Sequence, residues 1–393
     1  MKAEPDIVSG RAVNGLRILH AYEPRDGGVP FFVADLAQGQ AARGHEVHVL
    51  GPPATWRGRA VTTNLTVHEW QIKRRNLFAL IQGRRQLVSL VLENSVDVVH
   101  LHSFVAGLIG RMARLPAAAV VFQPNAWSFD IAGVVGQAAL PWEKWATRNA
   151  DGIAVVCEDE RRRAESHGLR SKFFNTGTAV DLDYYHPVDE SVRGTLRRDL
   201  AVQQERLAVC IGRITPQKGQ DQLIAAWTAR SISDVELAIV GDGPSSVVTQ
   251  LRKLAGDAPV RCVGEQDDVR PWLWAADVVV QPSRWEGRSI VVGEALACGV
   301  PVVATDVSGM REAIYGPNGS AGAVVPPGDM NMLIEEMFRR IVDRRLNVAE
   351  RRIARSRAEV AYAPKAWLER TEDMYQALVK TPGASIPNPP RFA

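Results

Sequence analysis

Two carboxylates flank an expected helix start in the segment PSRWEGRSIVVGEALACGVPVV, residues 282–303. A helix that starts near Ser289 leaves Glu286 in the preceding loop and puts Glu294 more than one turn inside. The first turn of a helix presents free N–H groups to an anion, and carboxylates accept hydrogen bonds from hydroxyls. A phosphate held by amides and hydroxyls held by carboxylates together indicate a sugar nucleotide. The alternative is that Glu286 is an ordinary first-turn acid and Glu294 a surface residue.

Two cations lie in CIGRITPQKGQDQLI, residues 210–224, where Arg213 ends an expected strand and Lys218 precedes the next helix. Cations at a strand end beside a helix N-terminus suit a diphosphate. The alternative is a solvated loop, because helix starts favour acids over Lys. Gly27 and Gly28 occupy the first strand-to-helix turn, where amides can approach a phosphate or simply make a tight turn.

Three further residues have weaker signals. His100 and His102 lie on one face of an expected strand, which could suggest a metal site. No third ligand is evident nearby, so a satisfied core or rim histidine is the favoured interpretation. Asp130 could contact the hydroxyls of an acceptor molecule or could cap a turn.

Five basic residues surround NLFALIQG (76–83): Lys73, Arg74, Arg75, Arg84 and Arg85. This segment could be an amphipathic helix on a membrane surface or a site for a phosphate-bearing acceptor. A solvated helix face explains it equally well.

The elements that must position these residues are short apolar runs separated by longer helical stretches. The runs are rich in β-branched residues and mostly lack strict alternation, which is typical of parallel strands buried on both faces. The sequence therefore predicts an α/β fold of repeated strand–helix units. The expected strands are 16–22, 45–51, 96–102, 118–124, 152–157, 206–212, 235–241, 260–264, 277–283, 300–306 and 322–327.

A polar, turn-rich stretch at 175–191 interrupts this pattern and marks the expected junction of two domains. We predict a first Rossmann-like domain over residues 1–190 and a second over 191–365. Residues 366–393 are expected to form a C-terminal helix and tail that pack back on the first domain. A ligand would bind in the cleft between the two sheets.

Composition excludes several classes of protein. The 393 residues are 46% hydrophobic and 23% charged, as in ordinary globular proteins. A net charge of +3 without a single-sign tail argues against a dedicated nucleic-acid binder. The four cysteines are widely separated, which favours a reducing compartment and argues against structural zinc. The N-terminus is polar and no apolar run reaches about 18 residues, so we expect a soluble cytosolic protein.

In the order and spacing of its motifs the chain resembles retaining glycosyltransferases of the GT-B fold, in the large family-4 group. The resemblance spans nearly the whole chain and includes the Glu286–Glu294 spacing of that group. The matching motifs are the Gly-Gly turn (27–28), RGHEVHVL (43–50), VDVVHLHS (96–103), GTAVDLDYYHP (177–187), GRITPQKG (212–219), VGDGP (240–244), ADVVVQPSRWEG (276–287) and EALACGVPVVATDVSG (294–309).

The resemblance implies two Rossmann-like domains facing across a cleft, with C-terminal helices returning toward the first domain. It also implies a role for each matching position. Arg213 and Lys218 would hold the donor diphosphate, Glu286 the sugar hydroxyls and Glu294 the ribose hydroxyls. Other donor contacts would come from the backbone of Gly27, Gly28, Gly287, Arg288, Ser289 and Ile290, with Val263 and Gly264 near the base. Apart from the resemblance, the residue types alone lead us to assign acceptor contacts to His102, Asp130, Arg74 and Arg75.

Two positions depart from the family pattern. The family usually has E-G-F-G where this chain has Glu286, Gly287, Arg288 and Ser289. Related sequences commonly carry His where Asn125 stands, near the donor sugar and its phosphate. Asn cannot become a cation, so either the donor sugar is unusual or another group covers that function.

The implied activity is transfer of a sugar from a nucleoside diphosphate sugar to a small acceptor, with no metal and no cofactor. Its partners would be a sugar nucleotide and an acceptor, with peripheral membrane contact through residues 73–85 and no nucleic acid. The alternatives are a membrane-lipid acceptor, a sugar-nucleotide epimerase, or a binding protein of GT-B shape. A dehydrogenase is disfavoured, because no G-x-G-x-x-G follows the first strand.

Overall fold

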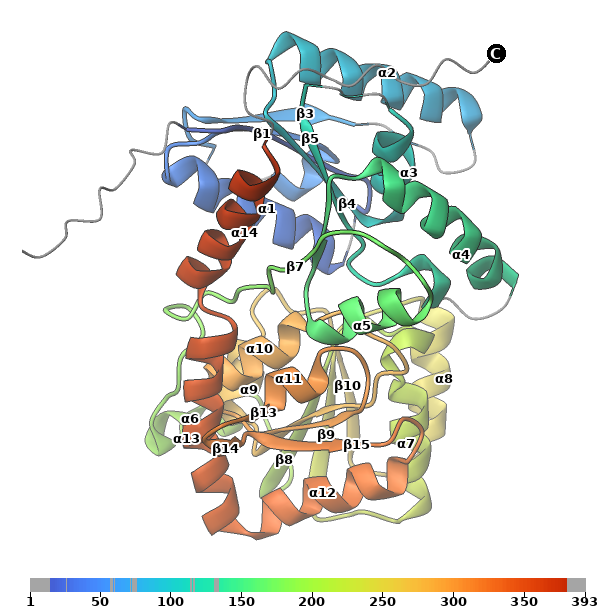
Figure 1. Cartoon of the computed structure of the whole chain (residues 1–393). Helices are drawn as coiled ribbons and strands as arrows, with labels where there is room; N and C mark the ends of the chain where they lie inside the picture. The colour runs from blue at the N-terminus through green and yellow to red at the C-terminus, as the bar shows by residue number, and fades with distance from the viewer. Residues whose placement is uncertain are drawn as a thin grey trace, which may run out of the picture.

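The computed structural model describes residues 15–379, apart from residues 26, 57, 58, 60, 71, 73–75, 114, 116 and 131–133. Within these residues two parallel sheets lie one above the other, each covered by helices (Figure 1). This arrangement confirms the predicted α/β class with two Rossmann-like units. The exact domain limits at 190 and 365 stay a prediction.

The first sheet has the strand order β3-β2-β1-β4-β5-β6-β7 in the described part of the chain. Its inner strands are buried along almost their whole length, because helices cover both faces. The strands are β1 (Arg17–Tyr22), β2 (Glu46–Gly51), β3 (Leu65–Glu69), β4 (Val98–His102), β5 (Ala119–Gln123), β6 (Gly152–Val155) and β7 (Phe173–Asn175). The helices are α1 (Gly28–Ala42), α2 (Leu77–Glu93), α3 (Ser103–Met112), α4 (Val134–Ala146) and α5 (Glu158–Ser166).

The second sheet has the order β10-β9-β8-β11-β12-β15 in the described part of the chain. Its strands are β8 (Arg206–Ile211), β9 (Val235–Val240), β10 (Val260–Gly264), β11 (Val278–Gln281), β12 (Val302–Thr305) and β15 (Gly322–Val325), and β13 (Tyr315–Gly316) and β14 (Gly319–Ser320) form a separate hairpin. The helices are α6 (Glu190–Asp199), α7 (Gln220–Ala229), α8 (Ser245–Ala255), α9 (Arg270–Ala275), α10 (Ile290–Ala297), α11 (Met310–Ile314), α12 (Met330–Val342) and α13 (Arg344–Ala361).

The last helix, α14 (Pro364–Leu378), returns to the first unit, as expected (Figure 1). Its residues Met374, Tyr375 and Leu378 share one buried cluster with Ile18 and Val98. The tail from residue 380 onward, which was expected to pack with this helix, lies outside the described residues. The two crossings between the units run side by side, because the Val180 amide donates to the Tyr362 carbonyl at 3.0 Å.

The carboxyl ends of the strands in each sheet face the other unit. In open parallel sheets, ligands bind beyond these strand ends. The residues that follow β1, β5, β8 and β11 therefore lie where a ligand would bind.

Candidate active site

The turn after β1 meets the turn after β8 across the junction of the two units. Gly27 has φ 84°, which favours glycine, and a Cβ atom there would lie 3.1 Å from Nη2 of Arg213. A Cβ atom at Gly28 would lie 3.4 Å from Cδ1 of Ile290. The structure thus brings the predicted phosphate-binding glycines to the predicted diphosphate cation.

Lys218 and Glu286 form an ion pair beside this contact. The Nζ atom of Lys218 lies 2.6 Å from Oε1 of Glu286, and both side chains are largely buried. Ser283 donates to the same carboxylate oxygen at 2.8 Å. The loops that carry Lys218 and Glu286 approach closely, because a Cβ atom at Gly219 would lie 2.2 Å from the Pro282 carbonyl oxygen. The ammonium group and the carboxylate therefore sit in one polar site.

The segment after Glu286 is built as predicted. Helix α10 begins at Ile290, Ser289 is its N-cap, and the Ser289 hydroxyl accepts from the Val292 amide at 3.4 Å. Glu286 therefore lies in the loop before the helix and Glu294 lies inside it. The predicted roles of the Gly287, Arg288, Ser289 and Ile290 amides toward a donor stay predictions.

Glu294 is only partly exposed, unlike the surface residue of the alternative interpretation. Tyr185 hydrogen-bonds to its carboxyl group. Burial raises the pKa of Glu294 to about 7, while the Tyr185 hydroxyl and the Lys218 charge act in the opposite direction. A carboxyl group poised in this way can accept hydrogen bonds from hydroxyls of a ligand. Tyr185 lies in the segment 177–187, and nothing in its residue type indicated this contact.

Asn125 follows β5 and lies over the Glu286–Ser289 turn. A Cβ atom at Gly287 would lie 3.5 Å from the carbonyl carbon of Asn125 and 3.6 Å from the amide nitrogen of Ala126. Both Asn125, with φ 53°, and Ala126, with φ 99°, have left-handed backbones. The position at which related sequences carry His therefore faces the expected donor site.

The Arg288 side chain does not point into the donor site. Its Nη1 donates to the Val156 carbonyl at 3.2 Å, its Nη2 donates to the Ala361 carbonyl at 3.1 Å, and its guanidinium lies 4.6 Å from the Tyr362 ring centre. Where the family pattern has Phe, this chain therefore has a side chain that bonds to two carbonyls at the junction of the units.

Val263 and Gly264 lie at the end of β10, the strand at the edge of the second sheet. The Gly241 amide donates to the Gly264 carbonyl at 2.8 Å, and a Cβ atom at Gly241 would lie 2.2 Å from the Gly212 carbonyl oxygen. These strand ends therefore adjoin the segment that carries Arg213. A base-binding role for Val263 and Gly264 stays a prediction.

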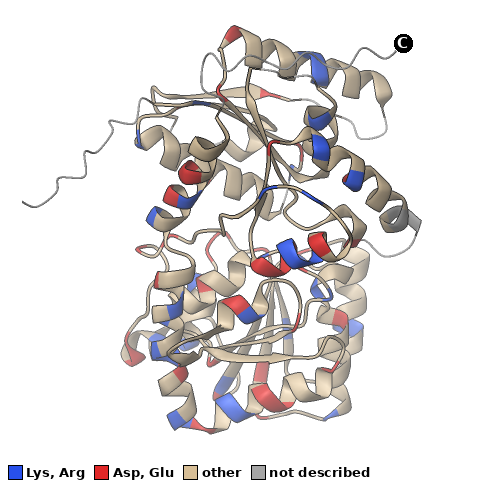
Figure 2. Ribbon diagram, viewed as in Figure 1, with Lys and Arg blue, Asp and Glu red and all other residues tan. Residues whose placement is uncertain are grey.

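A cavity of about 640 Å³, lined in part by Glu286, lies between the units. We call it the junction cavity, and its lining includes Asp130 and Arg163 from the first unit and Arg284, Glu286 and Arg311 from the second. Charges of both signs are concentrated on α5 at this junction (Figure 2). Asp130 forms an ion pair with Arg163. The structure thus brings Asp130, a predicted acceptor contact, to the same cavity as Glu286.

His102 is not brought to this cavity, because it is completely buried, as are His100 and His20. The nitrogens of these three rings lie within 4.8 Å of one another, so the expectation of no third nearby imidazole is wrong. The reason is strand pairing, since β1 and β4 are neighbours and His20 lies opposite His100. Burial lowers the pKa of His20 to about 4 and those of the other two well below 6.5.

The three imidazoles are tied to flanking helices. Gln40 on α1 lies 2.7 Å from Nε2 of His20, and the Tyr375 hydroxyl on α14 lies 2.7 Å from Nδ1 of His100. His20 and His102 lie 3.0 Å apart through Nδ1 and Nε2. The cluster therefore helps to anchor α14 on the first sheet, and contact of His102 with an acceptor is not supported by its position.

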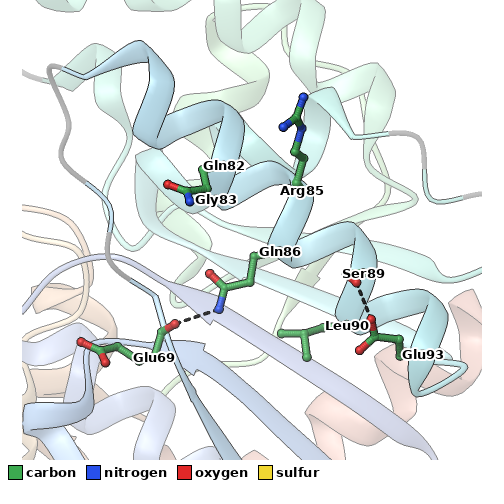
Figure 3. A pocket seen from close by; sticks show the side chains of 8 residues that line it. All are labelled: Glu69, Gln82, Gly83, Arg85, Gln86, Ser89, Leu90 and Glu93. Atoms are coloured by element: carbon green, nitrogen blue, oxygen red, sulfur yellow. Dashed lines mark hydrogen bonds between the residues drawn. The ribbon is translucent and has the colours of Figure 1, made fainter.

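The basic segment is only partly described. Lys73, Arg74 and Arg75 lie outside the described residues, whereas Arg84 and Arg85 are exposed on α2. A second cavity, of about 630 Å³, lies on α2 over the end of β3 (Figure 3). There Gln86 donates to the Glu69 carbonyl at 2.8 Å. None of the helices in the described part of the chain is long and apolar enough to cross a membrane.

Comparison with known proteins matches both halves of the chain. Residues 205–343 match the family described as "Glycosyl transferases group 1", and residues 27–172 match "Glycosyl transferase 4-like domain". A similar curated protein is the GDP-mannose-dependent alpha-(1-6)-phosphatidylinositol monomannoside mannosyltransferase of Mycolicibacterium smegmatis. It is 28% identical over 344 residues, which cover 81% of this chain and 86% of that protein.

Solved structures share the fold. Sucrose-phosphate synthase from Thermosynechococcus elongatus superposes with a TM-score of 0.80 at 20% identity, over 92% of this chain and 99% of that one. Anabaena Alr3699/HepE in complex with UDP and glucose superposes with a TM-score of 0.77 at 21% identity, over 92% of this chain and 100% of that one.

Proposed function

Because the chain belongs to the GT-B glycosyltransferases of the GT4 type, we propose that it transfers a sugar from a nucleoside diphosphate sugar to a small acceptor with retention. The observation that carries this proposal is the buried Lys218–Glu286 pair, on loops that adjoin Arg213, with Arg213 itself facing Gly27. It combines a cationic place for a diphosphate with a carboxylate for sugar hydroxyls.

The reaction breaks the bond between the anomeric carbon and the leaving phosphate oxygen and forms a bond to the acceptor oxygen. Negative charge accumulates on the diphosphate, and Arg213 and Lys218 would stabilise it together with the α10 amides. The departing phosphate oxygen would take the proton of the acceptor on the same face of the sugar. No second carboxylate is needed for this mechanism.

The acceptor would enter through the junction cavity, since Glu286 lines this cavity and also pairs with Lys218. Asp130 lies on the cavity wall and can accept from an acceptor hydroxyl. Closure of the two units would exclude water, which would otherwise hydrolyse the donor. We also propose a cytoplasmic location, in keeping with four unpaired cysteines among the described residues.

Transfer should not depend on a metal ion or a cofactor. We expect the rate of nucleoside diphosphate release in EDTA to equal the rate in magnesium, because Arg213 and Lys218 supply the charge that a metal would otherwise supply. The measurement is the initial rate after dialysis against EDTA. A complete loss that added magnesium restores would contradict the proposed mechanism.

Asn125→His should change the choice of donor. His tolerates the φ of 53° at this position, so we expect the turn to be retained. A protonated imidazole carries a positive charge when it donates to the donor sugar or its phosphate, whereas the Asn amide is always neutral. We expect a different order of preference in competition between donors, with nucleoside diphosphate affinity within about twofold of wild type. An unchanged order would show that Asn125 does not tune the donor, and so would a loss of diphosphate binding.

A membrane-lipid acceptor is the second candidate, and α2 favours it. Leu77 and Phe78 are 72% and 71% exposed on this helix, and Arg84 and Arg85 lie one to two turns further along. The mycobacterial relative is named for a phosphatidylinositol monomannoside. Apolar and basic side chains on one exposed helix suit an anionic lipid surface.

This candidate predicts co-sedimentation with vesicles of phosphatidylglycerol and phosphatidylcholine. Replacing both Leu77 and Phe78 with Ser should lower the bound fraction about tenfold or more, because two apolar side chains no longer enter the interface. Val360→Ser, at another exposed apolar position, is the matched control. If the wild-type protein stays in the supernatant, the acceptor is not presented at such a surface.

A panel of UDP-, GDP- and ADP-sugars tests the proposed function, with and without candidate acceptors. We expect acceptor-dependent release of one nucleoside diphosphate. Conversion of the donor to an epimer without an acceptor would favour the epimerase alternative. Binding without turnover across the panel would favour a binding protein.

A further inference from the structure

The turn between Asn125 and Ala126 stores backbone strain. Among the described residues these are the two consecutive non-glycine residues with positive φ, at 53° and 99°. Asparagine adopts positive φ more readily than most residues, whereas alanine at 99° is disfavoured and persists only where its surroundings hold it. Strain of this kind concentrates at functional sites, and here it faces Gly287 of the Glu286–Ser289 turn.

The carboxylate of Glu160 accepts a hydrogen bond from the backbone of this turn. Its Oε1 accepts from the Ala126 amide at 2.9 Å and its Oε2 accepts from the Val156 amide at 2.8 Å. The Trp127 indole donates to the Glu160 carbonyl at 2.9 Å. The glutamate is only 2% exposed, so both carboxylate oxygens are committed to backbone amides rather than to water.

Arg288 continues the connection into the second unit. Its guanidinium bonds to the carbonyl of Val156, the residue whose amide Glu160 binds, and also to the carbonyl of Ala361 in the second crossing. Arg288 directly follows Gly287, which lies beside the Asn125–Ala126 backbone, since a Cβ atom at Gly287 would lie 3.5 Å from the Asn125 carbonyl carbon. Two routes, one direct and one through Glu160, Val156 and Arg288, therefore join the strained turn to the donor-binding turn.

We propose that Glu160 and Arg288 are positioning residues that hold the Asn125–Ala126 turn over the donor sugar when the units close. Neither side chain is placed to touch the substrate. This proposal rests on the proposed function, because the turn has a donor sugar to hold only if the protein is a glycosyltransferase. Burial raises the pKa of Glu160 to about 7, and the hydrogen bonds from the Val156 and Ala126 amides act in the opposite direction.

Glu160→Gln tests one end of the route, because an amide accepts at one atom only and presents its NH₂ to the other backbone N–H. We expect kcat for transfer to fall about 10- to 100-fold, because a small misplacement of the reacting groups lowers the rate by about this much. The affinity for the nucleoside diphosphate should stay within about twofold, since Arg213 and Lys218 are unchanged. More donor should be lost to water, because closure is impaired. Glu165→Gln, exposed on the same helix, is the matched control.

Arg288→Ala tests the role of the second positioning residue. It also keeps the proposal testable if the Glu160→Gln variant does not fold. It should reproduce the same split between kcat and diphosphate affinity, and Arg288→Lys should not restore kcat because one ammonium cannot bridge the two carbonyls in the same way. The double variant should be no worse than the poorer single variant, because both act on one route.

Three results would overturn the inference. They are wild-type kcat in both variants, an equal loss of kcat and diphosphate affinity, and single effects that multiply in the double variant. Wild-type protein assayed in parallel separates this failure from failure of the proposed function. Absence of transfer by the wild type across the donor panel would reject the function, whereas normal transfer by both Glu160→Gln and Arg288→Ala would reject only the inference.

Discussion

Replacing Lys218 or Arg213 with alanine should lower kcat/KM for transfer by about 2–4 kcal/mol of transition-state stabilisation, or roughly 30- to 1000-fold. Arg213 faces Gly27 across the junction and Lys218 pairs with Glu286, so we expect both cations to lie where the leaving diphosphate gains charge. Affinity for the free nucleoside diphosphate should fall as well, because the same charges bind it in the ground state. Steady-state kinetics and calorimetric titration measure the two quantities.

Lys218→Ala also leaves Glu286 without its 2.6 Å partner, so the loss could come from a displaced carboxylate. A double-mutant cycle with Glu286→Gln separates the two effects, because neighbours that act together are not additive. Lys253→Ala, at an exposed position on α8, is the control for removing a positive charge. Near wild-type turnover in both the Arg213 and Lys218 variants would show that the diphosphate lies elsewhere.

Glu286→Gln should lower kcat/KM by about 1.5–3 kcal/mol, the range for hydrogen bonds to a charged group. The substitution keeps the shape of the side chain but removes its negative charge. The charged carboxylate pairs with Lys218 and would accept hydrogen bonds from the sugar hydroxyls. It should weaken binding of the nucleoside diphosphate sugar more than binding of the nucleoside diphosphate, since only the former carries the sugar. Competition titration of the two ligands gives this difference.

Glu205→Gln, exposed at the start of the second sheet, controls for loss of a negative charge. Equal weakening of both ligands by Glu286→Gln would assign Glu286 to positioning Lys218 rather than to the sugar. No effect on either ligand would remove Glu286 from the site.

The sequence predicted the buried strands well, because a strand covered on both faces must be apolar throughout. It missed β3 and β7, which lie at the two edges of the first sheet. Strand β3 reads LTVHE and has only one fully buried residue, so its composition matches a loop as well as a strand. In the first sheet the edge strands lack the apolar signature of the interior ones, whereas β10 and β15, at the edges of the second sheet, keep enough of it to be predicted.

The site was predictable where residue type and turn chemistry act locally, as at Ser289 and Gly27. It was not predictable where the fold selects one residue among similar neighbours. Glu160 lies in EDERRRAES, where every acid looks exposed, and only the packing of α5 shows which carboxylate is buried. The Arg288 side chain likewise turns to two distant carbonyls that only the assembled crossings provide.

The most direct measurement is a crystal structure with the nucleoside diphosphate that the donor panel identifies. We expect diphosphate oxygens within about 3.2 Å of Arg213 and Lys218 and of amides at Gly28 and the start of α10. The ribose should lie against Glu294. A diphosphate bound away from the junction of the two units, such as in the cavity on α2, would contradict the proposed site and the mechanism built on it.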